Sequence, residues 1–196
     1  MQRPLLVVIA LRVETQGLLE AAGARLLFTG AGKVNAAYAL TRELAECRAR
    51  GEAPEVVNLG TAGSRRYPTG SVVACRRFAQ RDMDVTGLGF TLGVTPFEDH
   101  VPPELEFAER FSQLPHGICG TGDRFEAHSA ALPWDLIDME AYALAKVCFL
   151  SQVPFACAKY VTDGADDAAA NDWQTNLNAA AREFVKLYEW LKAEPG

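Results

Sequence analysis

Short apolar runs alternate with segments of helical periodicity along this chain, and this alternation constrains its fold more than any other feature. The runs expected to be strands are 5–11, 24–30, 54–60, 70–78, 117–122, 136–139 and 154–163. The segments expected to be helices are 13–22, 33–50, 139–150 and 172–193. Strands separated by helices form mostly parallel sheets that are covered on both faces. The pattern therefore predicts an α/β protein with three layers, α/β/α, around a central mixed, mostly parallel sheet.

Two of the expected helices have an apolar face with a spacing of three to four residues. In the helix that begins at Lys33, this face consists of Val34, Ala37, Leu40, Leu44 and Cys47. In the C-terminal helix, it consists of Leu177, Ala180, Phe184, Leu187 and Leu191. The stretch 91–116 contains four prolines and is expected to be a loop with one helical turn. No linker or repeat interrupts the pattern, so residues 1–196 are expected to form a single domain.

The charge balance argues against partners that are polyanions. The chain has 19 Lys and Arg residues against 25 Asp and Glu, which gives a net charge of −6, and its basic residues form no stripe. Nucleic acid and anionic membrane are therefore not expected as partners. The run "LLVVIAL" (5–11) is too short to span a bilayer and is followed by no cleavage site, so we expect a first buried strand of a soluble, cytoplasmic protein.

The cysteines and histidines indicate neither a disulfide framework nor a metal site. The cysteines are Cys47, Cys75, Cys119, Cys148 and Cys157, scattered without CxxC spacing and mostly within apolar runs. They are expected to be buried free thiols. The histidines are His100, His116 and His128, which lie in loop contexts without metal-ligand spacing and are expected at the surface. No metal and no cofactor are therefore expected.

Acidic and glycine-rich segments follow several of the expected strands. Ligands of open α/β sheets bind at the carboxyl ends of strands. The segments expected at this edge are Glu14, "TGAG" (29–32), "NLGTAGS" (58–64), "DME" (138–140) and "TDGAD" (162–166). They predict a site rich in carboxylates with two glycine-rich turns, and periodicity and spacing lead no further than this.

Each acid also has a structural interpretation. A helix N-terminus favours negative charge, so capping explains either Asp138 or Glu140 but not both. Asp163 is either a turn former or a carboxylate at the mouth of a buried strand, where its pKa can be raised for use as a general acid. Glu14, taken alone, is expected to be a solvated helix residue. The glycines of "FTGAGKVNAA" (28–37) either present N–H groups to an anion or serve only the turn, since neither a P-loop nor a complete GxGxxG motif is present.

Taken together, these stretches resemble the nucleoside phosphorylase superfamily and, within it, the methylthioadenosine/S-adenosylhomocysteine nucleosidases. The resemblance rests on motifs that occur in the family's order from Thr29 to Asp166. They are "TGAGKVNAA", "VVNLGTAGS", "RRFAQRDMDVTGLGF", "GTGDRF", "DMEAYALAKVC" and "VTDGAD". Each motif is weak by itself, but the ordered set is specific.

The resemblance implies hydrolysis of the N-glycosidic bond of a 5′-modified adenosine through an oxocarbenium-like transition state. By position, the resemblance implies that Asp163, held by Thr162, protonates the purine, and that Glu14 activates a water that Thr61 helps to fix. It implies that Glu140 binds the ribose hydroxyls and that Met139 packs on the sugar. It also implies that Phe125 stacks on the base and that the backbone of Glu126 forms hydrogen bonds with the edge of the purine. Ala62 and Gly63 belong to the same substrate-binding segment as Thr61. A homodimer is expected by the same analogy.

Other functions of the superfamily remain as alternatives at this stage. Hexameric purine nucleoside phosphorylases have an arginine where this chain has Asn58, which favours hydrolysis, although Arg65 and Arg66 follow closely. A phosphate-dependent phosphorylase and a non-catalytic nucleoside-binding protein are the two alternatives. Ala31 and Leu11 replace bulkier residues of the family's 5′ pocket, so a different or larger 5′ group is expected. The role of Phe97 as a cover for that pocket and the reason for Tyr142 beside Glu140 are open.

Overall fold

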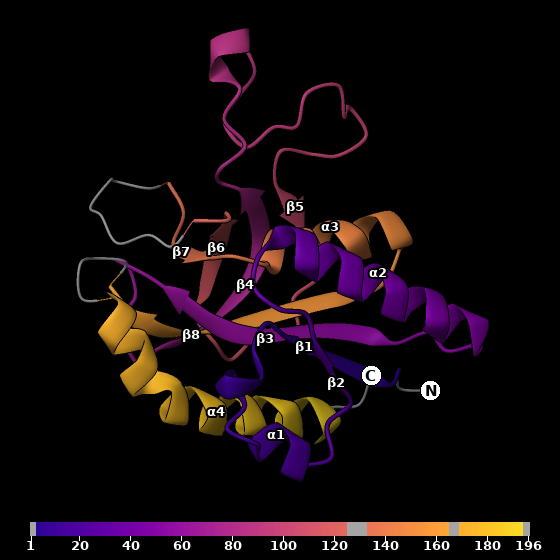
Figure 1. Ribbon diagram of the computed structural model, residues 1–196, viewed down its shortest axis with the longest axis vertical. Coiled ribbons are helices and arrows are strands. Elements are labelled where there is room, and N and C mark those ends of the chain that lie inside the picture. Colours follow the sequence, from indigo (N-terminus) through magenta and orange to yellow (C-terminus); the bar gives the residue numbers. More distant parts are fainter. Residues whose placement is uncertain (1–2, 125–132, 165–168, 194–196) are drawn as a thin grey trace.

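The computed structural model describes residues 3–124, 133–164 and 169–193 (Figure 1). The strands are β1 (Leu5–Ile9), β2 (Leu26–Phe28), β3 (Glu55–Gly63), β4 (Val72–Gln80), β5 (Leu105–Glu106), β6 (His116–Thr121), β7 (Leu136–Asp138) and β8 (Phe155–Asp163). The α-helices are α1 (Leu18–Ala21), α2 (Lys33–Ala49), α3 (Ala141–Ser151) and α4 (Ala169–Ala193). Two 3-10 turns, η1 (Arg12–Glu14) and η2 (Thr86–Leu88), complete the described elements.

The strands form one mixed sheet in which part of the chain closes on itself. Parallel pairs join β2 to β1, β1 to β3, β3 to β8, β4 to β6 and β6 to β7, whereas β4 is antiparallel to β8 and β5. A short antiparallel contact between Gly63 and Ile137 joins β3 to β7. The strands β3, β8, β4, β6 and β7 therefore form a closed ring, and the carboxyl ends of β3, β7 and β8 meet.

Helices cover both faces of this sheet, as Figure 1 shows, with α2 and α3 on one side and α1 and α4 on the other. One buried core contains Leu40 and Leu44 of α2 together with Leu144 of α3. The core on the opposite face includes residues of α1 and α4. All five residues of the predicted C-terminal apolar face are buried, and Ala180, Phe184, Leu187 and Leu191 belong to this core. The predicted three-layer α/β fold is confirmed.

The differences from the predicted elements lie mainly at the ends of helices. The expected helix 13–22 is divided into η1 and α1. The expected helical turn in 91–116 is wrong, since the only regular element between Thr91 and the start of β6 at His116 is the two-residue strand β5. Val34 was expected on the buried face of α2 but is 78% exposed. It lies six residues before Leu40, so at 3.6 residues per turn it points about 120° away from that face.

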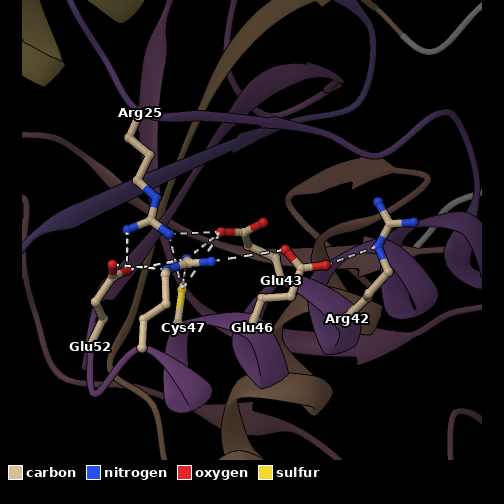
Figure 2. Close-up of polar contacts among 7 residues, drawn as sticks. Arg25, Arg42, Glu43, Glu46, Cys47 and Glu52 are labelled. Carbon is tan, nitrogen blue, oxygen red and sulfur yellow. Dashed lines mark hydrogen bonds and ion pairs between the residues drawn. The ribbon is translucent and has the colours of Figure 1, made fainter.

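A polar network fixes the carboxyl half of α2 to the segment before β2 (Figure 2). The guanidinium of Arg25 donates to Glu43 and Glu52, each at 2.7 Å, and to the sulfur of Cys47 at 3.1 Å. Arg50 bonds to Glu52 as well, at 2.9 Å. Hydrogen bonds from Arg50 and Arg25 lower the pKa of Glu52 to about 2. The contacts give α2 a polar attachment in addition to its apolar face.

The cysteines are free and buried, as predicted. His100 and His116 lie at the surface, which also confirms the prediction, while His128 lies outside the described residues. Within the described part of the chain, no helix is long and apolar enough to span a bilayer.

Candidate active site

A cavity of about 500 Å³ lies where the ends of β1, β3, β7 and β8 meet. This volume is within the usual range for a small-molecule site. The described residues predicted for the site all line it: Glu14, Thr61, Ala62, Gly63, Met139, Glu140, Thr162 and Asp163. Phe125 and Glu126 lie outside the described residues. The structure thus brings together segments that are up to 149 positions apart in the sequence, from Glu14 to Asp163.

Glu14 ends η1 and is buried, with 3% of its surface exposed, so its interpretation as a solvated helix residue is wrong. Its Oε1 accepts hydrogen bonds from the backbone N–H of Thr61 at 3.1 Å and from the Thr61 hydroxyl at 2.9 Å. Its Oε2 accepts from the backbone N–H of Leu11 at 3.0 Å. Every one of these partners is a donor, and together they hold the carboxylate between the residues that follow β1 and Thr61 of β3.

Asp163 is the last residue of β8 and is 4% exposed. The hydroxyl of Thr162 donates to its Oδ2 at 2.8 Å. The backbone N–H of Ser64 donates to the carbonyl of Asp163 at 3.0 Å, which fixes the end of β8 beside β3. The predicted contact between Thr162 and Asp163 is therefore present, and the carboxylate lies on a rigid strand end.

Glu140 is the N-cap residue of α3 and reaches across to the start of α2. Its Oε1 accepts the backbone N–H of Gly32 at 2.8 Å. Burial raises the pKa of Glu140 to about 7, and the negative charge of Asp138 adds to this effect. Gly32 has a φ of +92°, which favours glycine, and it makes this N–H available. The anion held by the "FTGAG" turn is thus a carboxylate of the protein itself.

Asp138 forms a buried ion pair that the sequence analysis missed. Its Oδ2 lies 2.9 Å from Nζ of Lys159 and accepts the backbone N–H of Ala141 at 2.8 Å, so of the two acids considered for capping it is Asp138 whose carboxylate caps α3. Burial alone would raise the pKa of Asp138, but the charge of Lys159 and the hydrogen bonds lower it. A lysine inside the otherwise apolar run "FACAKYV" was the available signal for this pair.

Gly60 leaves space in which the side chains of Lys159 and Glu14 approach each other. A Cβ atom at this position would lie 3.2 Å from Nζ of Lys159 and 3.7 Å from Oε1 of Glu14. The ammonium is held by Asp138 and cannot withdraw without breaking a buried ion pair. The small residues of "NLGTAGS" therefore allow charged side chains from β8 and η1 to meet at β3.

Other residues noted in the sequence take clear places. Leu11 and Ala31 line the cavity, whereas Phe97 is 87% exposed, contacts Phe90, and does not line it. Tyr142 is 4% exposed and packs in the core, where burial raises its pKa. Asn58 is buried and donates to the carbonyl of Val8 at 3.0 Å, so its amide joins β3 to β1.

The arginines near the cavity divide into two groups. Arg65 and Arg66 were considered as anion ligands, but they line a separate surface hollow, and Arg66 pairs with Asp135 at 2.6 Å. Arg81 and Arg124 line the main cavity and were not predicted. Arg81 donates to the carbonyl of Gly122 at 3.3 Å.

Comparisons with known proteins agree with this geometry. A 5′-methylthioadenosine/S-adenosylhomocysteine nucleosidase of Marinomonas sp. (strain MWYL1) is 32% identical over 195 residues, which cover 89% of this chain and 83% of the relative. The nucleosidase of that name from Neisseria meningitidis, solved in complex with methylthio-immucillin-A, is 26% identical with a TM-score of 0.80 and covers 97% of this chain and 98% of that one. A futalosine hydrolase mutant of Helicobacter pylori is 18% identical with a TM-score of 0.85 over 99% of this chain and 100% of that one, which shows a shared fold.

The family model of the phosphorylase superfamily matches residues 10–191. With the mixed sheet and the carboxylate-lined cavity at its edge, this match shows that the chain belongs to the phosphorylase superfamily. Within that superfamily, it is an enzyme of the nucleosidase type, an N-glycosyl hydrolase.

Proposed function

We propose that this enzyme hydrolyses the N-glycosidic bond of a 5′-modified adenosine and releases the free base. The observation that supports this most directly is the placement of Glu14, Glu140 and Asp163 in one cavity, each held by a different segment. Cleavage of this bond needs a proton for the leaving base, a water for the anomeric carbon and a ligand for the ribose. Three separately positioned carboxylates can supply these three functions.

In the proposed mechanism, the protonated carboxyl of Asp163 donates to the departing purine while the C1′–N9 bond breaks. Glu14 accepts a proton from the water that attacks C1′ of the oxocarbenium-like sugar. The second oxygen of Glu140 accepts from the ribose hydroxyls, since its Oε1 is already bonded to Gly32. Met139, which lies between Asp138 and Glu140, packs on the sugar. The carboxylates also stabilise the positive charge that develops on the ribose.

The substrate class is proposed from the relatives and from the cavity. Several curated relatives carry the name methylthioadenosine/S-adenosylhomocysteine nucleosidase, and futalosine hydrolase shares the fold. Near the starts of α2 and η1, the cavity is lined by Ala31 and Leu11, whose side chains are small and medium in size. This supports a 5′ substituent that is apolar and at least as large as methylthio.

A panel of nucleosides tests the proposal. The enzyme is incubated with 5′-methylthioadenosine, S-adenosylhomocysteine, futalosine, adenosine and inosine, and the released base is quantified by chromatography with and without phosphate. We expect adenine from a 5′-modified adenosine at a rate that phosphate does not change. Base release from none of these nucleosides would overturn the proposal.

A phosphorylase remains a second candidate because Arg81 and Arg124 line the same cavity. Two guanidinium groups could bind a phosphate co-substrate. Against this, the other buried cation, Lys159, is paired with Asp138, and the amide of Asn58 is used between strands. Strict dependence on phosphate and formation of a ribose 1-phosphate product would establish the phosphorylase in place of the hydrolase.

We also propose that the single domain of residues 1–196 forms a homodimer. Among the described residues, four large apolar side chains are strongly exposed: Val34 at 78%, Tyr38 at 67%, Leu88 at 76% and Phe97 at 87%. An ion pair between Lys33 and Asp82 joins the start of α2 to the beginning of the segment between β4 and β5, which contains Phe97 and projects away from the sheet in Figure 1. Large exposed apolar side chains favour association with a second surface.

A further inference from the structure

The amino end of α4 returns to the candidate active site. Figure 1 shows α4 beneath the sheet with its first turns beside the end of β8. Trp173 and Gln174 line the cavity, and the side-chain amide of Asn176 donates to the carbonyl of Thr162 at 3.1 Å. The sequence of this helix predicts only an apolar face that packs on the sheet, and these polar contacts were not predicted.

Trp173 is linked to Glu14 through a single residue, Thr61, whose hydroxyl bonds to both side chains. Its indole Nε1–H donates to the hydroxyl oxygen of Thr61 at 2.9 Å, and the Thr61 hydroxyl donates to Oε1 of Glu14 at 2.9 Å. An indole N–H can only donate, and a hydroxyl has a single hydrogen. The Thr61 oxygen must therefore accept from Trp173, which leaves its own hydrogen free to point at Glu14.

We propose that Trp173 is a positioning residue that orients the Thr61 hydroxyl toward Glu14, the group that activates water in the proposed function. Without the indole N–H, the Thr61 hydroxyl can rotate and donate to another acceptor, including the water that attacks C1′ in the proposed function. Glu14 then keeps the backbone N–H of Thr61 but loses one of its two bonds at Oε1. The inference concerns the same site and rests on the proposed nucleosidase activity.

The nitrogen of Trp173, and not its ring, carries this role. Trp173→Phe keeps an aromatic side chain at the cavity wall and removes the only polar atom of the indole. Trp190 offers a matched control on the same helix, because it packs on Phe111 with ring centroids 5.7 Å apart and does not line the cavity. Trp190→Phe is therefore expected to leave kcat and KM unchanged.

The decisive experiment is a double-mutant cycle between Trp173 and Thr61, with kcat and KM measured for adenine release from 5′-methylthioadenosine. We expect Trp173→Phe to lower kcat about tenfold, with KM changed less than about twofold. In the Thr61→Val background, the same change should lower kcat less than about twofold, because no hydroxyl remains to be oriented. Thr61→Ser keeps the hydroxyl and should restore the tenfold effect. Equal effects of Trp173→Phe in the wild-type and Val backgrounds, or no effect in either, would overturn the inference.

A readout without substrate separates this inference from the proposed function. The indole ¹⁵N–¹H resonance of Trp173 is identified by its loss in Trp173→Phe, and circular dichroism establishes that each variant is folded. We expect Thr61→Val to shift this resonance and Thr61→Ser to leave it near its wild-type position. A resonance that Thr61→Val does not move contradicts the inference even if the wild-type enzyme is active. An inactive wild-type enzyme with a shifted resonance would overturn the proposed function and leave the hydrogen-bond chain intact.

Discussion

At the scale of single residues, the four carboxylates around the cavity differ in what surrounds them. Asp138 is neutralised by Lys159, and Glu14 is held by donors from Thr61 and Leu11. Glu140 lies beside the Asp138 charge and accepts the N–H of Gly32, and burial raises its pKa to about 7. Similar side chains thus obtain different properties from their neighbours, which is how a site can divide acid, base and binding roles among carboxyl groups.

The proposed general acid can be tested at Asp163. Asp163→Asn keeps the shape of the side chain and its contact with Thr162 but removes the transferable proton. We expect kcat for adenine release to fall at least about a hundredfold, with substrate affinity changed far less. Stopped assays give kcat, and calorimetric titration of the variant with 5′-methylthioadenosine gives affinity. An unchanged kcat would support the non-catalytic or a different mechanistic interpretation of this site.

The raised pKa of Glu140 predicts a pH dependence of substrate binding. Below pH 7 the side chain is mostly protonated, and above it the carboxylate can accept from both ribose hydroxyls. We therefore expect KM for 5′-methylthioadenosine to decrease as the pH rises from about 6 to about 8. Glu140→Gln cannot ionise, so its KM should be higher and constant over this range. A wild-type KM that is flat between these pH values contradicts the assignment.

Gly60 is the residue at which added volume should disturb the charges most directly. Gly60→Ala places a methyl group against Nζ of Lys159, and we expect at least about a tenfold loss of kcat as Lys159 and Glu14 are displaced. Gly87 is the matched control, since a Cβ there meets nothing within 4 Å. Steady-state kinetics of both alanine variants measure the difference. Equal activities of the two variants would show that the site tolerates the methyl group.

At the scale of elements, α2 is attached at two different surfaces. Its apolar face packs in the core, and its carboxyl half is held by Arg25 through Glu43 and Glu52 (Figure 2). A network of this kind can contribute more than an isolated surface pair, whose median contribution is small. The start of α2 serves the site, because Gly32 binds Glu140 there. The polar attachment therefore helps to hold the helix whose N-cap residue, Gly32, binds Glu140 about one turn before Ala36, the first buried residue of α2.

Removal of the Arg25 guanidinium should weaken this attachment. Arg25→Met keeps most of the aliphatic stem, and we expect the free energy of unfolding to decrease by about 1 kcal/mol. Arg42 is the control. It lies on α2 in Figure 2, but its side chain is 63% exposed and its ion pair, to Glu46, is long at 3.8 Å. Arg42→Ala should therefore change stability by less than about 0.5 kcal/mol. Urea unfolding of both variants, at low and high salt, measures the two values, and equal values would contradict a stabilising network.

At the scale of the whole molecule, closure of the strand ring determines where the site lies. The contact of Gly63 with Ile137 brings the end of β7 against β3, and β8 lies on the other side of β3. The ends that carry Thr61, Glu140 and Asp163 therefore converge on one cavity instead of spreading along an open edge. The order of strands along the chain does not reveal this closure, because it depends on pairings between distant segments.

The proposed dimer predicts a change of molecular mass. Val34→Glu with Tyr38→Glu places two charges on an exposed apolar part of α2 that makes little contact with the core. We expect light scattering to give the mass of two chains for the wild type and of one chain for the variant, because burial of these charges is unfavourable. Wild-type protein with the mass of one chain would contradict the proposal. Circular dichroism establishes that the variant remains folded.

The sequence by itself determined the layers, most of the strands and the identity of the residues that gather at the site. Apolar runs and a spacing of three to four residues are local patterns, so they can be recognised without knowledge of the fold, and the ordered motifs indicated the superfamily. Even so, the local pattern misplaced Val34 and predicted one helix over 13–22 where the structure has η1 and α1, because burial at helix ends is decided by neighbouring elements.

Only the tertiary structure decided the state of each charged group. Glu14 looks like a solvated residue in the sequence and is buried, and Lys159 looks like an interruption of a strand and is the partner of Asp138. Trp173 reaches Thr61 across 112 positions of the chain. Burial, charge pairing and donor direction depend on atoms supplied by other segments, and these are fixed when the strand ring closes and α4 packs beneath it.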